Sequence, residues 1–219
     1  MSKAKKIVAI ADNHTYFDID VPDGDILICA GDITSTGELS TIHKFNEFLG
    51  SLPHKHKVVI AGNHDFCFEK RLIDTLKLLT NCTYLHDSGV QIDDIYIYGS
   101  PWQPWFLDWA FNLPRGGQEL KKIWNLIPEK TNILVTHSPP LGFGDITKEG
   151  EACGCEDLLA AVERVKPQAH IFGHIHEGYG IYENDETLFI NASICTRRYQ
   201  PINKPITFVY DNGAIKDYL

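Results

Sequence analysis

The sequence predicts an α/β protein in which two sheets pack face to face with helices on the outside. In two stretches of the chain, short apolar runs alternate with helical patterns, which is typical of β-α units with buried strands. Between these stretches and after the second one, short apolar runs are separated by turn residues, which indicates strands without helices between them. The length and the even composition indicate a single domain over residues 1–219.

The first stretch contains three candidate buried strands, at residues 7–11, 26–30 and 58–61. A helix is predicted between the second and third strands by the helical spacing of Leu39, Ile42, Phe45, Phe48 and Leu49. Another helix is predicted after the third strand by the spacing of Leu72, Ile73, Leu76 and Leu79. Beyond it, a meander of strands is predicted by the short runs at 83–85, 90–92 and 95–98.

The second stretch again alternates helices with strands. An amphipathic helix is predicted by the i, i+3, i+4, i+7 spacing of Leu120, Ile123, Trp124 and Ile127. We expect strands at 133–135 and 169–172, and between them a helix that ends before Pro167 and carries Leu158, Leu159, Val162 and Val165. Closing strands are expected at 179–182, 188–190 and 206–210, with a turn at Asn184 and Asp185.

The composition excludes several classes of protein. The formal net charge of −9 and the scattered basic residues argue against binding to a nucleic-acid polymer, which needs clustered Lys and Arg. No apolar run approaches the ~20 residues of a membrane helix, so we expect no membrane partner. The apolar stretch after the basic N-terminus ends at Asp12 and is too short for a signal peptide. We therefore expect a cytoplasmic protein whose six cysteines are reduced.

Five polar motifs each follow an apolar run that we interpret as a buried strand. In chain order they are Asp12-Asn13-His14, Gly31-Asp32, Gly62-Asn63-His64-Asp65, Thr136-His137 and Gly173-His174-Ile175-His176. Open α/β folds bind ligands in loops at the carboxyl ends of strands, so we expect these motifs to lie together. Their carboxylate, imidazole and amide groups are those that a two-metal hydrolytic site needs.

The spacing of these residues suggests how cations could be shared. Asp12 and His14 are two residues apart and would point the same way on an extended segment, so they can share one cation. The two oxygens of Asp32 can bridge two cations, and Asn63 offers a neutral oxygen. Imidazoles come from His137, His174 and His176. Because the set has nitrogen and oxygen ligands and no thiolate, it suits Mn, Fe, Zn or Co better than a structural zinc site.

Three other patterns have simpler interpretations. His54 and His56 form a His-x-His pair without an acidic partner, and we interpret them as part of a solvated loop. Cys153 and Cys155 lack a second cysteine pair at zinc-site spacing, so we expect no metal there. An aromatic cluster comprises Trp102, Trp105, Phe106 and Trp109. Packing within the protein is its first interpretation, and stacking on a nucleobase is the alternative.

The five motifs resemble the signature of the calcineurin-like metallophosphoesterase superfamily, which runs D-x-H, G-D, G-N-H-[DE], G-H and G-H-x-H. Further stretches, at 99–105, 136–142, 173–180 and 191–193, are similar to a narrower branch, the metallophosphoesterase-domain-containing phosphodiesterases known from animal brain. Some members of that branch carry Gly in the last histidine pair. This chain has both His174 and His176, which favours a competent site.

The resemblance implies a four-layer αββα sandwich of two mixed sheets flanked by helices. It also implies two divalent or trivalent metal ions, of which manganese is the first expectation. The first ion would be held by Asp12, His14, Asp32 and His176, and the second by Asp32, Asn63, His137 and His174. His64 is left without a metal and is expected to stabilise or protonate the leaving alkoxide. Asp65 would either orient His64 through a hydrogen bond or have a structural role.

The expected function is hydrolysis of a small phosphodiester or nucleotide, such as a cyclic nucleotide, by a hydroxide that bridges the two ions. One alternative is a phosphomonoesterase, although such phosphatases usually carry Glu at the position of Asp65. Another is a non-catalytic scaffold. Degenerate metal ligands would mark such a scaffold, and this sequence contains none. A nuclease is disfavoured by the lack of basic patches. The sequence indicates no oligomeric state.

Overall fold

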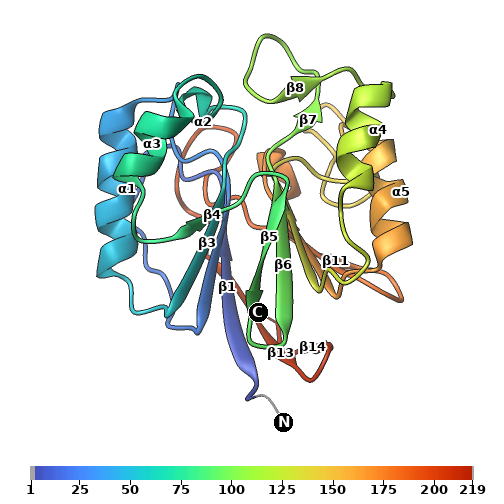
Figure 1. Cartoon of the computed structure of the whole chain (residues 1–219). Helices are drawn as coiled ribbons and strands as arrows, with labels where there is room; N and C mark the ends of the chain where they lie inside the picture. The colour runs from blue at the N-terminus through green and yellow to red at the C-terminus, as the bar shows by residue number, and fades with distance from the viewer. Residues whose placement is uncertain (1–2, 219) are drawn as a thin grey trace.

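Two six-stranded mixed sheets, packed face to face, form the centre of the computed structural model, which describes residues 3–218. Three helices, α1 (Leu39–Ser51), α2 (Phe66–Lys70) and α3 (Leu72–Leu78), lie outside the first sheet. Two others, α4 (Gln118–Asn125) and α5 (Glu156–Val165), lie outside the second (Figure 1). This arrangement confirms the predicted αββα sandwich. No helix within residues 3–218 is long and apolar enough to cross a membrane.

The first sheet has the strand order β14-β13-β1-β2-β3-β4. Its strands are β1 (Lys5–Ile10), β2 (Ile26–Ala30), β3 (His56–Ile60), β4 (Thr83–Tyr84), β13 (Ile206–Asp211) and β14 (Ala214–Lys216). The strands β1 to β4 are parallel, and β13 pairs with β1 antiparallel. Because β1, β2 and β3 run the same way, the loops that follow them leave from one edge of the sheet.

The second sheet has the order β11-β12-β10-β9-β6-β5. Its strands are β5 (Ser88–Ile92), β6 (Ile95–Ser100), β9 (Ile133–Thr136), β10 (Ala169–Phe172), β11 (Gly180–Glu183) and β12 (Leu188–Asn191). The four central strands are parallel, with β5 and β11 antiparallel at the two edges. The loops after β9 and β10 therefore also share one edge.

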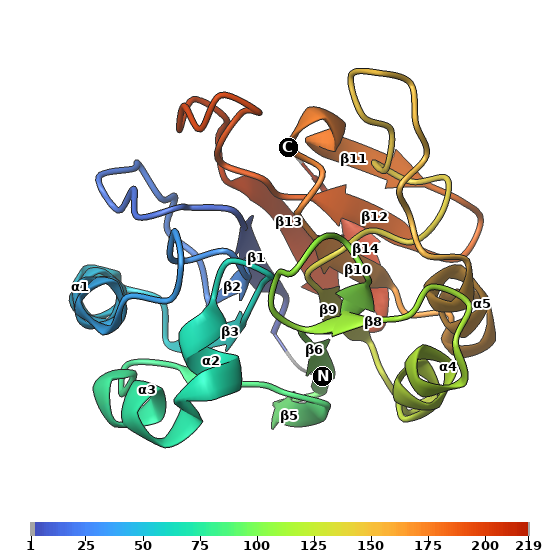
Figure 2. The same ribbon diagram turned by 90° about the horizontal axis from the view of Figure 1, so that it is seen from above.

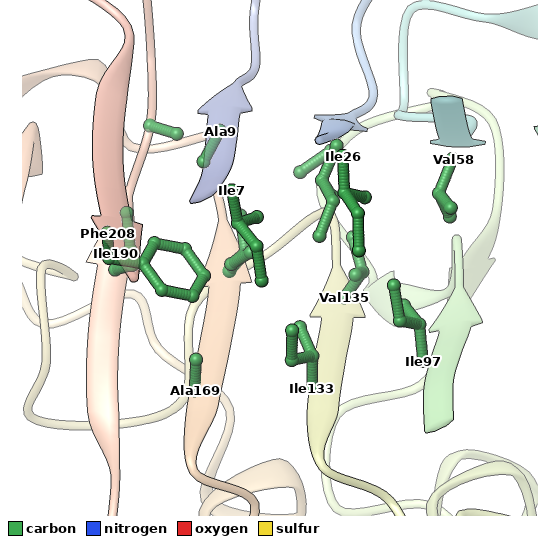
Figure 3. Packing of buried hydrophobic residues seen from close by; sticks show 14 of the residues in the cluster. Ile7, Ala9, Ile26, Val58, Ile97, Ile133, Val135, Ala169, Ile190 and Phe208 are labelled. Carbon is green, nitrogen blue, oxygen red and sulfur yellow. The ribbon is translucent and has the colours of Figure 1, made fainter. Parts of the chain in front are cut away.

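Aliphatic side chains from the facing sides of both sheets form the central core. Ile7 and Ile26 from the first sheet meet Ile97, Ile133 and Val135 from the second, and all five are fully buried (Figure 3). Complete burial of such a side chain stabilises the fold by roughly 1.5–3 kcal/mol. Two further apolar clusters lie between each sheet and its own helices. The strands are buried on both faces, which explains why they appear in the sequence as continuous apolar runs.

The two sheets are joined by backbone hydrogen bonds at the edge where these loops emerge. Ala11, just after β1, donates to the Ala192 carbonyl at 2.8 Å and accepts from the Ile194 amide at 2.8 Å. Figure 2 looks onto this end of the molecule from above, with α1 to α3 on one side and α4 and α5 on the other. The joint brings the loops of the first sheet against those of the second.

Several local expectations are wrong. The solvated loop expected at His54 and His56 is replaced by a buried His54 and by the start of β3 at His56. The helix α2, the edge strand β14 and a short parallel ribbon of β7 (Gln103–Pro104) and β8 (Asn112–Leu113) were not expected. The predicted meander is split, because its first strand, β4, belongs to the first sheet. One cysteine also has a structural role that the sequence did not indicate, because the Cys155 thiol accepts a hydrogen bond from Leu158 N and caps the start of α5.

Candidate metal centre

All seven predicted metal ligands and His64 lie at the shared edge of the two sheets, in loops except for His176, which begins a short 3₁₀ helix, His176–Gly178. The loops after β1, β2 and β3 carry Asp12 and His14, then Asp32, then Asn63 and His64. The loops after β9 and β10 carry His137, and then His174 and His176. The five motifs, which were expected to lie together after their strands, are therefore neighbours in the folded chain.

Four of these residues have left-handed backbone conformations, with φ of 53° at Asp12, 42° at His14, 54° at Asp32 and 68° at His174. Residues other than glycine rarely adopt positive φ, and such strain gathers at functional sites because the surrounding structure holds it in place. Close packing also explains a glycine in the motifs. A Cβ on Gly62 would overlap the Asp32 side chain.

The first group of ligands converges around His14 and His176. Their Nε2 atoms are 3.3 Å apart, and the Nε2 of His176 is 3.5 Å from Oδ1 of Asp12. The Nε2 of His14 is 3.7 Å from Oδ2 of Asp32. The ligand atoms of Asp12, His14 and His176 lie within 4.8 Å of one another, so these three residues can hold a cation, with Asp32 next to His14.

The second group converges around His137. Its Nε2 is 2.9 Å from Oδ1 of Asn63 and 3.3 Å from Oδ2 of Asp32. The His174 ring lies beside it, with ring centroids 5.1 Å apart. Asp32 is therefore common to both groups through the same oxygen, Oδ2, and it is almost fully buried.

Hydrogen bonds to backbone carbonyls outside the site orient one histidine of each group, His176 in the first and His137 in the second. The Nδ1 of His137 is 2.9 Å from the Ala30 carbonyl, and the Nδ1 of His176 is 2.9 Å from the Thr196 carbonyl. A carbonyl can only accept, so Nδ1 donates its hydrogen in each ring and Nε2 is the nitrogen that faces the site. This arrangement is typical of metal-ligating histidines, so the donor set fits a metal centre.

The charges within the site are tightly coupled. Burial opposes ionisation of Asp12, but His176 and His137 together outweigh it and the pKa of Asp12 falls to about 2. The pKa of Asp32 is lowered in the same way, since its histidine neighbours, with His137 the strongest, together outweigh its burial. Conversely, these carboxylates overcome the effect of burial on His137 and His176 and raise the pKa of each to about 9. A bound cation would displace those protons and take over the neutralisation.

His64 stands at the rim, between the ligands and the open cleft. Its Nδ1 is 2.7 Å from the Ser35 carbonyl, and its Nε2 is 3.9 Å from Oδ2 of Asp32. The ring of Trp109 lies over it with centroids 4.0 Å apart. His64 is also close enough to His14 and Asp32 to form a third potential ligand group. Nε2 is therefore the ring nitrogen available to the site.

Asp65 does not orient His64, which corrects one of its two expected roles. Its buried carboxylate accepts hydrogen bonds from the amides of Ile33, Thr34 and Gly62 at 2.8–3.2 Å and from the Thr34 hydroxyl at 2.9 Å. Burial and the neighbouring charge of Asp32 raise its pKa to about 6. Asp65 ties the loop after β2 to the loop after β3. The Ser35 carbonyl is the group that holds the His64 ring.

A cleft of about 280 Å³ opens onto the ligands. Its wall includes residues that the motifs did not indicate, namely Thr147, Glu149, Glu177, Arg197 and Tyr199. The Tyr199 ring meets the His14 ring edge-on with centroids 4.8 Å apart. Tyr199 N also donates to the Thr196 carbonyl that orients His176. No side-chain pattern marks a backbone carbonyl such as that of Thr196, so sequence reasoning could not find this support.

Comparisons with known proteins identify relatives of this chain in sequence and in fold. The calcineurin-like phosphoesterase family model matches residues 5–178, which contain every predicted ligand. "Metallophosphoesterase domain-containing protein 1" of Homo sapiens is 49% identical over 227 residues, covering 92% of this chain and 69% of the relative. "UPF0046 protein K07C11.7" of Caenorhabditis elegans is 42% identical, covering 93% of this chain and 74% of the relative. The solved structure of TT1561 from Thermus thermophilus matches 98% of both chains at 12% identity with a TM-score of 0.64, which shows a shared fold.

Proposed function

This chain belongs to the calcineurin-like phosphoesterase family, and we propose that it is a two-metal phosphodiesterase of small substrates, including cyclic nucleotides. The observation that carries the proposal is the position of Asp32. Its Oδ2 lies 3.7 Å from Nε2 of His14 and 3.3 Å from Nε2 of His137, so one carboxylate joins both ligand groups. A shared carboxylate is the arrangement that holds two cations close together.

Two bound cations would supply an activated water as nucleophile and a clamp for the phosphoryl oxygens, and we take manganese as the first metal to test. By the family resemblance, the first would be held by Asp12, His14, Asp32 and His176, and the second by Asp32, Asn63, His137 and His174. Two groups of close ligand atoms support these sets, namely Asp12 with His14 and His176, and Asp32 with His137 and Asp12. The remaining chemistry belongs to side chains of the chain. Imidazoles that direct Nε2 toward the site, together with buried carboxylates, preorganise it before substrate enters.

His64 is proposed to act on the leaving group. Its Nδ1–H is committed to the Ser35 carbonyl, so Nε2 is the atom that can meet a substrate oxygen in the cleft. In the protonated ring, Nε2–H would donate to the leaving alkoxide and stabilise the charge that develops there. The Trp109 ring fixes the plane of the imidazole, which keeps that nitrogen directed toward the cleft.

The charge of the cleft favours a diester over a monoester. Arg197 is the one Lys or Arg side chain among the described residues of its wall, and it pairs with Glu149 at 2.9 Å and with Glu177 at 3.5 Å. A phosphomonoester carries up to two negative charges near neutral pH, because its second pKa is about 6. A diester carries one. With Arg197 paired to two carboxylates, the described wall offers no spare Lys or Arg for the second charge.

The test is to supplement the purified protein with Mn²⁺, measure bound metal, and compare hydrolysis of bis-p-nitrophenyl phosphate with that of p-nitrophenyl phosphate. We expect two bound ions per chain and faster turnover of the diester. The variant His176→Ala should lose one ion and turnover, whereas His43→Ala, an exposed histidine on α1, should retain both. Preferred monoester hydrolysis would support a phosphomonoesterase instead. Metal binding without turnover on either ester would support a non-catalytic scaffold.

A further inference from the structure

A second cavity, of about 210 Å³, adjoins the metal cleft on the side of His174. The two spaces share Phe106, Thr147 and His174, so a single molecule can extend from one into the other. The remaining wall is formed by Pro104, Trp105, Arg115, Ser138, Cys153 and Ile175. For comparison, an apolar cavity of about 150 Å³ is large enough to take a benzene ring.

Aromatic side chains at the mouth of this cavity are exposed although the loop that carries them is firmly held. Trp105 is 58% exposed and Phe106 is 51% exposed. The Asn112 side chain binds the loop from within, donating to the Leu107 carbonyl at 2.8 Å and accepting from Gln103 Nε2 at 3.1 Å. Large apolar rings that stay exposed on an ordered loop are typical of ligand sites.

The same loop is tied directly to the metal centre. The Ala110 amide donates to the carbonyl of the predicted ligand Asn63 at 3.1 Å. The Phe106 ring also meets the His174 ring, with centroids 6.2 Å apart and an interplanar angle of 79°. The aromatic wall therefore has a set position relative to the phosphoryl site.

A buried polar atom of the cavity wall gives an independent indication of a ligand. Ser138 is 3% exposed, and its Oγ has no hydrogen-bond partner within the described part of the chain. Leaving a buried hydroxyl unpaired costs roughly 1–3 kcal/mol, which a polar atom of a bound molecule would offset. Arg115 brings no free charge, because it bonds the Cys153 and Gly154 carbonyls and pairs with Glu156.

We infer that this cavity is a subsite for a planar aromatic ring on one ester group of the substrate. Trp105 and Phe106 would pack against the ring, and the Ser138 hydroxyl would donate to a nitrogen or oxygen at its edge. Within residues 3–218, Trp109 already packs on His64 and Phe66, whereas Trp105 has no ring partner. The inference rests on the proposed function, since the ring is carried by the phosphoester bound at the metal centre.

Binding of phosphinates to the Mn²⁺-loaded protein tests the subsite without any turnover. Dimethylphosphinate and methylphenylphosphinate both carry the single charge of a diester and have no hydrolysable ester bond. In the wild type, calorimetric titration should give a Kd for the phenyl compound at least about tenfold below that of the dimethyl compound. Trp105→Ala and Phe106→Ala should each reduce that ratio by roughly fivefold or more, since ring stacking contributes at this level.

Two further variants sharpen the test. Ile73→Ala removes an exposed apolar side chain on α3 that lines neither cavity, and it should leave the ratio unchanged. A 3-pyridyl phosphinate should bind more tightly than the phenyl compound, and Ser138→Ala should remove that difference while keeping the phenyl preference. An unchanged pyridyl preference in Ser138→Ala would overturn the role of the hydroxyl.

The outcomes separate the inference from the proposed function. Binding of dimethylphosphinate with no gain from the phenyl group would overturn the subsite alone. A phenyl gain that survives both Trp105→Ala and Phe106→Ala would also overturn it. Failure of the loaded wild type to bind either phosphinate would overturn the phosphoester site itself, and the subsite with it.

Discussion

The Ser193 hydroxyl lies 2.5 Å from Oδ2 of Asp12, so a residue just after β12 supports the first predicted ligand, 181 residues earlier in the chain. Oγ of Ser193 is also 2.7 Å from Oδ1 of Asn191. The hydroxyl has one proton and both neighbours are acceptors, so the shorter contact to the ionised carboxylate is the donated bond. The bond crosses from the second sheet to the first at the joint around Ala11.

Replacing Ser193 should therefore weaken metal binding without changing any ligand. For Ser193→Ala we expect the affinity for the first Mn²⁺ to fall by roughly 10–100-fold, as is usual when a partner of a metal ligand is removed. Titration with Mn²⁺ followed by calorimetry measures the change. Ser51→Ala at the exposed end of α1 is the matched control. Unchanged affinity in Ser193→Ala would show that the bond does not tune the site.

Removal of the His64 ring should separate chemistry from metal binding. His64→Ala should lower kcat by roughly 10²–10⁴-fold, the usual contribution of a general acid, while both ions remain bound. Steady-state kinetics and metal analysis on the same sample give the two readouts. Full activity would contradict the role in leaving-group departure. Loss of one ion would make His64 a ligand, as its closeness to His14 and Asp32 allows.

Asp65 should matter for stability because of the amides that it satisfies. Asp65→Ala leaves the buried amides of Ile33, Thr34 and Gly62 without their acceptor. Each such group costs roughly 1–3 kcal/mol, so the free energy of unfolding should fall by about 3 kcal/mol or more.

Urea unfolding in the presence of a chelator measures this loss apart from metal binding. The control is Asp74→Ala, which removes an exposed carboxylate on α3 that pairs with Arg71 at 3.3 Å. Its effect should stay below about 1 kcal/mol, as for other surface ion pairs. An equally small effect of Asp65→Ala would refute the loop-tying role.

His170, inside the second sheet, should make the fold sensitive to acid. Its Nε2 is 2.8 Å from Oγ1 of Thr136, whose own proton goes to the Ser138 carbonyl, so Nε2 carries the hydrogen. The Nδ1 is buried without a partner in the described chain. Burial lowers the pKa of His170 to about 3, whereas the unfolded value is about 6.5.

Because the folded pKa lies below the unfolded one, this stabilisation is complete above about pH 6.5 and is lost as the pH falls toward 3. Between pH 6.5 and 5 the loss should be about 2 kcal/mol, at 1.36 kcal/mol per pH unit. His170→Asn keeps a donor for Thr136 and does not titrate, so its decline should be smaller by that amount. Urea unfolding with a chelator at both pH values gives the comparison, and parallel declines would contradict the prediction.

The sequence predicted which polar side chains lie at the shared edge of the two sheets, because that position depends on side-chain type and on order along strands. Asp12, Asp32 and His137 each follow an apolar run, and parallel strands place such positions at one edge of a sheet. The alternation of apolar runs with helical patterns predicted both sheets and the outer helices for the same reason, since burial on two faces shows directly in composition.

Other predictions failed where burial is decided by packing rather than by residue type. His54 looks solvated beside two lysines, yet it is buried next to the first sheet. On α3 the apolar Ile73 is 74% exposed and Thr75 is buried, the reverse of what hydrophobic spacing indicates. The exposed aromatic rings of Trp105 and Phe106 likewise lie in a cluster that composition alone assigned first to packing.

The sequence by itself determined which candidate metal ligands the chain carries, in what order, and after which kind of strand they stand. Only the tertiary structure decided how they are supported. Ser193 hydrogen-bonds Asp12, and the Thr196 carbonyl orients His176. Asp65 binds the loop beside Asp32 and not the His64 ring. The physical reason is that ligand identity is a property of single side chains. Support comes from hydrogen bonds between segments far apart in the chain, and such bonds exist only once the two sheets have met.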